Sequence, residues 1–102
     1  MLNEADLNLL RSAQRALLGQ VTPVVRSVSF DIDGKTILAR AIFERSPDDD
    51  DRELISEAFT YVIANYVDEV MNDEFVVSDA DLKSLNLRLV AYERHEPILE
   101  DK

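Results

Sequence analysis

Four consecutive aspartates, Asp48 to Asp51, are the residues whose type and spacing most invite a chemical role. Carboxylates bind divalent cations, but a calcium loop alternates its ligands and contains a turn glycine. Adjacent residues at the start of a helix point about 100° apart, so their carboxylates do not converge on one ion. The run therefore predicts no metal site, and we expect no cofactor.

Other side chains that could carry catalysis are few. His95 is the one histidine, and its charged neighbours favour an ordinary surface residue. Mechanisms and metal clusters that need two histidines are therefore excluded. No serine lies in a Gly-x-Ser-x-Gly turn, Gly19 and Gly34 are too few for a phosphate-binding loop, and cysteine is absent. We predict that the chain is not an enzyme.

Paired carboxylates leave one enzymatic alternative open. General acid–base catalysis by two carboxylates needs a pocket that raises the pKa of one of them. A sequence does not reveal such a pocket. A small carboxylate-based hydrolase therefore stays as the least favoured of three functional hypotheses.

The acidic residues are concentrated in two segments. The chain carries 11 bases and 21 acids, a net charge of −10. Residues 44–57 hold seven acids and two bases, and residues 66–83 hold six acids and one base, so each segment contributes −5. Such a surface repels nucleic acid and anionic membranes, which bind through Lys and Arg, and attracts a cationic protein. The acids predicted to bind a partner are Asp48, Asp49, Asp50, Asp51, Glu53, Glu57, Asp68, Glu69, Asp73 and Glu74.

Tyr61 completes this predicted partner-binding set. It lies beside the acidic face of the second predicted helix. Aromatic residues are enriched among the anchors of protein interfaces. A partly buried ring at the edge of the helix is the alternative interpretation.

A chain of 102 residues, 46% of them hydrophobic, is expected to fold as one domain with one core. We assign this domain to residues 1–95 and predict a flexible C-terminal tail over residues 96–102. No apolar run approaches the roughly 18 residues of a membrane span. The amino terminus carries acids where a secretory signal would carry Lys or Arg. A cytoplasmic location is therefore expected.

Two amphipathic helices are predicted. Asn3 is expected to cap the first helix, and Gly19 to end it. Ser46 is expected to cap the second helix, with Pro47 as its first residue. An apolar stripe then runs along the second helix, formed by Leu54, Ile55, Ala58, Phe59, Val62, Ile63 and Tyr66.

Asp33 and Gly34 lie between two β-rich runs, which indicates a hairpin with a type I′ turn. A two-residue loop at these positions pairs Phe30 with Ile37 and makes one face of the hairpin apolar. The other face is polar near the turn, but farther away it carries apolar residues that need a cover or a partner. These are Val25, Leu38 and Ile42, and they leave self-association as a homodimer open.

The remaining strands are predicted over residues 69–77 and 85–94, with a polar link over residues 78–84. The order α-β-β-α-β-β predicts an α+β fold in which two helices pack on one face of a four-stranded, mainly antiparallel sheet. The order of the strands within the sheet does not follow from the sequence.

Four stretches carry a resemblance to a known class of protein. They are LLRSAQRALLGQVTPVVRSVSF, FDIDGKTILARAIFE, DDDDRELISEAFTYVIANY and RLVAYERHEP, which begin at residues 9, 30, 48 and 88. In order and spacing, the chain resembles the immunity proteins of contact-dependent growth inhibition and related bacterial polymorphic toxin systems. The resemblance spans nearly the whole chain. It implies a protein that binds and neutralises a toxin domain, which in such systems is frequently a nuclease.

The charge of the chain favours the same function. A nuclease presents Lys and Arg to phosphate, so a dense negative surface on an inhibitor would steer association and cover the active site. We therefore predict a non-enzymatic immunity protein that binds a cationic toxin through its acidic helix and the neighbouring loop. The second hypothesis is a homo-oligomeric scaffold or regulatory subunit without a toxin partner. Acids that only keep a small domain soluble would give the same composition.

Overall fold

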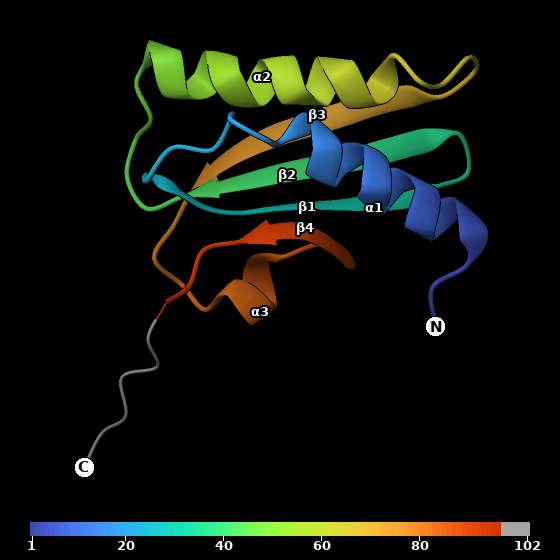
Figure 1. Ribbon diagram of the computed structural model, residues 1–102. Coiled ribbons are helices and arrows are strands. Elements are labelled where there is room, and N and C mark those ends of the chain that lie inside the picture. The colour runs from blue at the N-terminus through green and yellow to red at the C-terminus, as the bar shows by residue number, and fades with distance from the viewer. Residues whose placement is uncertain (97–102) are drawn as a thin grey trace.

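The computed structural model describes residues 1–96. Within these residues it contains three helices and one four-stranded sheet (Figure 1). Residues 97–102 of the predicted tail lie outside the described residues. The elements follow one another as α1 (Glu4–Ala16), β1 (Val25–Asp33), β2 (Thr36–Phe43), α2 (Asp49–Ile63), β3 (Val70–Val77), α3 (Leu82–Leu85) and β4 (Leu89–Glu93).

The sheet is mixed, with the strand order β3-β2-β1-β4. β1 pairs antiparallel with both β2 and β4. β2 and β3 are parallel, because α2 carries the chain back to the end of the sheet where β2 began. The prediction of an α+β fold with a mainly antiparallel sheet is confirmed, and one of the three strand pairs is parallel.

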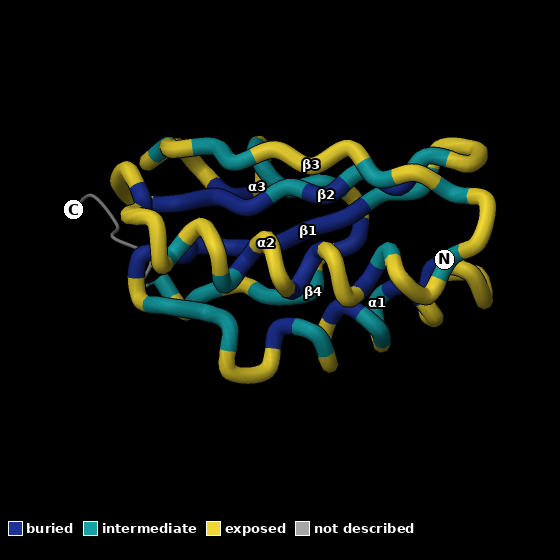
Figure 2. Tube along the Cα trace, turned by 90° about the horizontal axis from the view of Figure 1, so that it is seen from above, coloured by how far each residue is buried: buried dark blue, intermediate teal, exposed yellow. Residues whose placement is uncertain are grey.

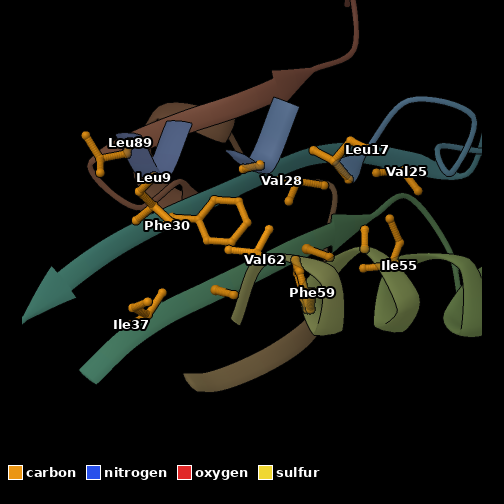
Figure 3. Packing of buried hydrophobic residues seen from close by; sticks show 14 of the residues in the cluster. Leu9, Leu17, Val25, Val28, Phe30, Ile37, Ile55, Phe59, Val62 and Leu89 are labelled. Atoms are coloured by element: carbon orange, nitrogen blue, oxygen red, sulfur yellow. The ribbon is translucent and has the colours of Figure 1, made fainter. Parts of the chain in front are cut away.

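α1 and α2 cover one face of the sheet and enclose the core (Figure 3). The rings of Phe30 and Phe59 pack edge to face with centroids 5.6 Å apart, and Phe59 meets Phe75 of β3 in the same way at 6.1 Å. The two central strands are buried over most of their length, whereas β3 is largely exposed (Figure 2). The predicted stripe of α2 supplies four buried residues, Ile55, Ala58, Phe59 and Val62.

α1 begins where the sequence predicts. The side-chain oxygen of Asn3 accepts a hydrogen bond from the Asp6 N–H at 2.8 Å, and the Asp6 carboxylate accepts one from the Asn3 N–H at 3.1 Å. This reciprocal capping box satisfies two backbone donors at the helix start. The helix ends at Ala16, and Gly19 lies in the turn that follows, with a φ of +77°.

The hairpin between β1 and β2 turns at Gly34 and Lys35, one residue later in the chain than predicted. Phe30 therefore pairs with Ala39 and not with Ile37. Gly34 has a φ of +63° and Lys35 does not have a positive φ, which fits a type II′ turn and not the predicted type I′ turn. Because the pairing shifts by two residues from Ser27 to Asp33, the side chains of this stretch stay on their predicted faces, whereas the bulge between Val25 and Ser27 places Val25 in the core.

The second face of the hairpin is covered by the chain itself. α3 lies on the side of the sheet opposite α2 (Figure 1). Ser27 and Ser29 are fully buried beneath this segment. The Ser27 hydroxyl donates to the Asn86 side-chain oxygen at 2.6 Å, and the Ser29 hydroxyl accepts from the Leu87 N–H at 2.9 Å. This face therefore needs no second molecule to satisfy its polar groups.

The apolar residues predicted to need a cover are mostly buried. Ile42 is fully buried outside the main core cluster. Val25 is fully buried within that cluster, next to a bulge between Val25 and Ser27 that shifts the strand pairing. Of the three residues, only Leu38 keeps partial exposure. Val25 and Ile42 are therefore not available as interface residues for the homodimer that the sequence leaves open.

The last strand is shorter than predicted. β4 covers Leu89–Glu93, whereas the sequence predicts a strand over residues 85–94. Within the predicted link, Asp81 caps a single helical turn by accepting a hydrogen bond from the Lys83 N–H at 3.2 Å, and Leu82 is buried. A helix of four residues is too short to produce a recognisable apolar period, so α3 was missed.

Candidate acidic binding surface

The aspartate run forms the N-terminus of α2, but its cap differs from the predicted one. Asp48, and not Ser46, is the N-cap. The Asp48 carboxylate accepts a hydrogen bond from the Asp51 N–H at 2.8 Å, and the Asp51 carboxylate accepts one from the Asp48 N–H at 3.2 Å. Pro47 precedes the cap and is buried. Because four successive aspartates allow several helix starts, the reciprocal pair decides which one forms.

Two of the predicted binding acids on α2 are hydrogen-bonded to side chains of another segment. The Thr22 hydroxyl donates to the Asp51 carboxylate at 2.7 Å, and this hydrogen bond is the main reason that the pKa of Asp51 is lowered. The Gln20 amide donates to the Glu57 carboxylate at 3.2 Å. Asp51 and Glu57 thus tie α2 to the segment that connects α1 to β1.

Three other acids on the same helix are free of such contacts. Asp49, Asp50 and Glu53 are exposed, and within residues 1–96 their side chains make no hydrogen bond or ion pair. Their carboxylates therefore face solvent on a rigid helix. We use the term α2 acidic surface for the six acids Asp48, Asp49, Asp50, Asp51, Glu53 and Glu57.

The predicted acids of the second segment lie elsewhere. α2 has 15 residues, which corresponds to about 22 Å at 1.5 Å per residue. Asp68 and Glu69 follow the far end of this helix and are separated from the aspartate run by about that length. Asp73 is exposed on β3, and Glu74 pairs with Arg40 of β2 at 2.5 Å. The two acidic segments of the sequence therefore do not form one compact cluster.

Tyr61 is half exposed, and it lies beside two arginines of α1, Arg11 and Arg15, as well as beside the acidic face of α2. It lines a groove of about 410 Å³ between α1 and the end of α2. The Asn65 amide donates to the Ser12 hydroxyl at 2.9 Å and joins the two helices there. The other residues that line this groove are Asn8, Arg11, Arg15 and Tyr66.

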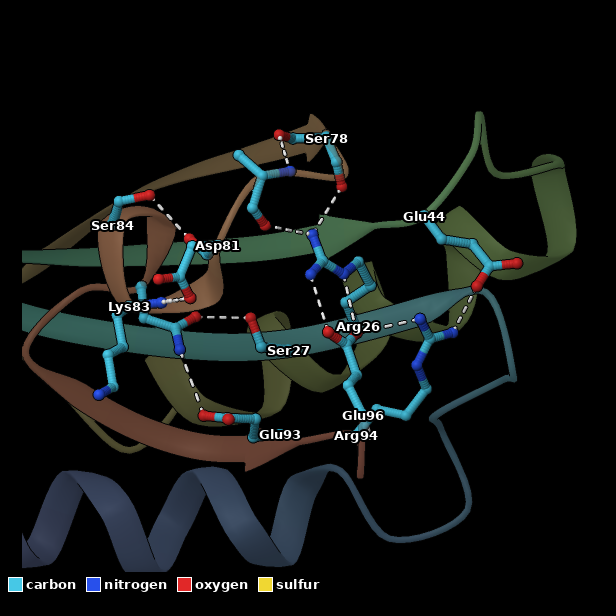
Figure 4. Close-up of polar contacts among 12 residues, drawn as sticks. Arg26, Ser27, Glu44, Ser78, Asp81, Lys83, Ser84, Glu93, Arg94 and Glu96 are labelled. Atoms are coloured by element: carbon cyan, nitrogen blue, oxygen red, sulfur yellow. Dashed lines mark hydrogen bonds and ion pairs between the residues drawn. The ribbon is translucent and has the colours of Figure 1, made fainter. Parts of the chain in front are cut away.

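A buried arginine connects the start of β1 to the end of the described chain (Figure 4). The Arg26 side chain is 8% exposed and donates two hydrogen bonds of 2.8 Å to the two carboxylate oxygens of Glu96. It also donates to the carbonyls of Ser78 and Ala80 at 2.8 and 2.9 Å. These contacts lower the pKa of Glu96 to about 2, chiefly through the hydrogen bonds from Arg26 and then through Arg94, and they outweigh burial, which alone would raise it.

Among residues 1–96, five of the eight arginines pair with carboxylates of the same chain. Arg88 links Asp6 of α1 to Asp31 of β1 at 2.9 and 3.0 Å. Arg94 donates to Glu44 at 2.6 Å. No sequence pattern predicts these pairs, because most of the partners are 34 to 82 residues apart. Of these bases, Arg45 also acts on the α2 acidic surface, because its charge contributes to the lowered pKa of Asp51.

The carboxylates whose pKa shifts are resolved all shift downward. Asp6, Glu44, Asp51 and Glu96 each accept a hydrogen bond that favours the charged form. A carboxylate-based hydrolase would need a raised pKa, and none of these four has one. In the described part of the chain, no group of three or more His, Asp or Glu residues is arranged to hold a metal ion.

The chain is a small α+β protein with free carboxylates fixed on an exposed helix, and among residues 1–96 no helix is long and apolar enough to span a membrane. Residues 6–96 match the family model of the MafI2 immunity protein. The chain belongs to this family, and its function is immunity against a toxin. The resemblance seen in the sequence is thereby confirmed. No curated protein matches the chain.

Proposed function

We propose that this immunity protein neutralises a cationic toxin domain by covering it with the α2 acidic surface. The toxin is a nuclease delivered by contact-dependent growth inhibition or a related polymorphic system. The immunity protein acts as an inhibitor and not as an enzyme. Because a nuclease attacks nucleic acid inside the cell, the proposal places the chain in the cytoplasm.

The observation that carries this proposal is the set of free carboxylates on α2. A nuclease binds phosphate through Lys and Arg, so its active site is positive and accessible. Asp49, Asp50 and Glu53 are exposed without a partner among the described residues, and they stand on a capped helix. An acidic helix that is already formed loses little conformational entropy when it binds. Its negative electrostatic potential raises the rate of association with a positive site.

The test reverses two free acids without touching the acids that hold the fold. Asp50→Lys with Glu53→Lys removes exposed charges only, whereas Asp51 and Glu57 must stay because Thr22 and Gln20 bind them. The measurements are the Kd for the purified toxin domain and the rescue of cells that express the toxin. We expect the double variant to bind at least about a hundredfold more weakly and to lose rescue.

A matched control changes the net charge by the same amount elsewhere. Asp33→Lys with Glu93→Lys alters two exposed acids on β1 and β4, where Glu93 receives only a 3.4 Å hydrogen bond from Asn86. We expect this control to bind with nearly the affinity of the wild type. If both double variants lose affinity equally, only net charge matters and the assignment to α2 is wrong. If neither loses affinity, the toxin docks on another surface.

A further inference from the structure

β3 is an edge strand that nothing in the described chain covers. It is hydrogen-bonded to β2 on one side only, and none of its eight residues is buried (Figure 2). Val70 and Val77, at its two ends, are 58% and 52% exposed. An uncovered strand edge offers unpaired backbone donors and acceptors to any second strand.

The hydrogen bonds to β2 show which residues of β3 face outward. The Val70 N–H donates to the Lys35 carbonyl at 2.9 Å, and the Ser78 N–H, just after the strand, donates to the Phe43 carbonyl at 3.0 Å. In a strand, the backbone N–H and C=O of alternate residues point to opposite sides. The even-numbered residues therefore bond to β2. The N–H and C=O groups that point away from the sheet belong to Met71, Asp73, Phe75 and Val77.

A second copy of the chain is a poor occupant for this edge. A two-fold antiparallel pair must match outward-facing residues with outward-facing residues. The two such registers with the greatest overlap place Asp73 opposite Asp73 or Glu74 opposite Glu74. Like charges directly opposite each other destabilise a strand pair. The acids of β3 thus oppose self-association and favour a basic strand.

We propose that a strand of the toxin partner adds to the free edge of β3 and extends the sheet to five strands. This inference rests on the proposed function, because it takes the same cationic partner. Asp73 has no ion pair among residues 1–96, so it is free to meet a Lys or Arg of the added strand. Val77, at the end of the same row, is 52% exposed and can contact an apolar side chain of that strand, whereas the Phe75 ring packs against Phe43 and Phe59. Backbone hydrogen bonds supply affinity, and these side chains supply selectivity.

Proline substitutions test this mode of binding directly. Proline at an outward-facing position removes one outward N–H and leaves the hydrogen bonds to β2 intact. Asp73→Pro is compared with Asp73→Asn, and Val77→Pro with Val77→Ala, because each control changes the side chain but keeps the N–H. We expect each proline variant to bind the purified toxin domain about tenfold or more weakly than its control. Circular dichroism and thermal unfolding check that each variant is folded.

Hydrogen exchange of the wild-type chain gives a second readout that needs no variant. In the complex with the toxin domain, the amides of Met71, Asp73, Phe75 and Val77 are expected to exchange more slowly than in the free chain. Equal affinity of each proline variant and its control, with no slowing at these amides, would overturn strand addition. If Asp50→Lys with Glu53→Lys still weakens binding in that case, the proposed function stands and only this inference fails.

Discussion

Glu96 is a residue whose charge stabilises the fold. Its pKa is lowered to about 2 from an ordinary value of 4.5, so its contribution is complete above pH 4.5 and is lost as the pH falls toward 2. We expect Glu96→Gln to lower the free energy of unfolding at pH 7 by about 1–3 kcal/mol. The difference between the variant and the wild type should shrink between pH 4.5 and 2.

Urea unfolding at pH 7 and pH 3 measures this difference. Glu53→Gln is the matched control, because Glu53 is exposed and makes no contact within residues 1–96. A Glu96→Gln variant as stable as the control at pH 7 would contradict the assigned role of the Arg26–Glu96 pair.

Local residue patterns predicted some of these roles and missed others. Asn3 was predicted as a cap because no other nearby residue competes for that role. Asp48 was missed because Ser46 and Pro47 also match a helix start, and the burial of Pro47 depends on the folded chain. The Arg26–Glu96 pair joins residues 70 positions apart, a distance at which periodicity carries no information.

The hairpin turn between β1 and β2 depends on the backbone of one residue. Gly34 has a φ of +63°, and a Cβ added there would meet no atom within 4 Å. Gly34→Ala is therefore expected to destabilise the protein by about 1 kcal/mol through backbone strain alone. Lys35→Ala, at the next position of the turn, should lower the free energy of unfolding much less. The shift in the urea midpoint measures both variants, and equal shifts would contradict the turn assignment.

At the scale of elements, the sequence predicted the helices and strands better than their arrangement. The stripe of α2 and the faces of the hairpin followed from periods of 3.6 and 2 residues. The parallel pairing of β2 with β3 depends on which way α2 crosses the sheet, which no local pattern records. The aspartates were correctly predicted to begin a helix. Their distance from Asp68 and Glu69 is set by the length of α2, which the structure shows.

The whole molecule is strongly negative, with a net charge of −10. If this charge steers the encounter with the toxin, the association rate constant should fall steeply as salt is added, because ions screen charges beyond about 10 Å at 0.1 M. Dissociation should change much less with salt. Stopped-flow measurements at several ionic strengths test this expectation. A rate constant that is independent of salt would show that charge does not guide the encounter.

The structure of the complex between this chain and its toxin domain tests the central claim most directly. We expect Asp49, Asp50 and Glu53 to lie within about 4 Å of Lys or Arg side chains of the toxin. The partner should also exclude water from the outer side of α2. A toxin that docks elsewhere and leaves these three carboxylates in solvent would contradict the proposed function, even though the chain would remain an immunity protein.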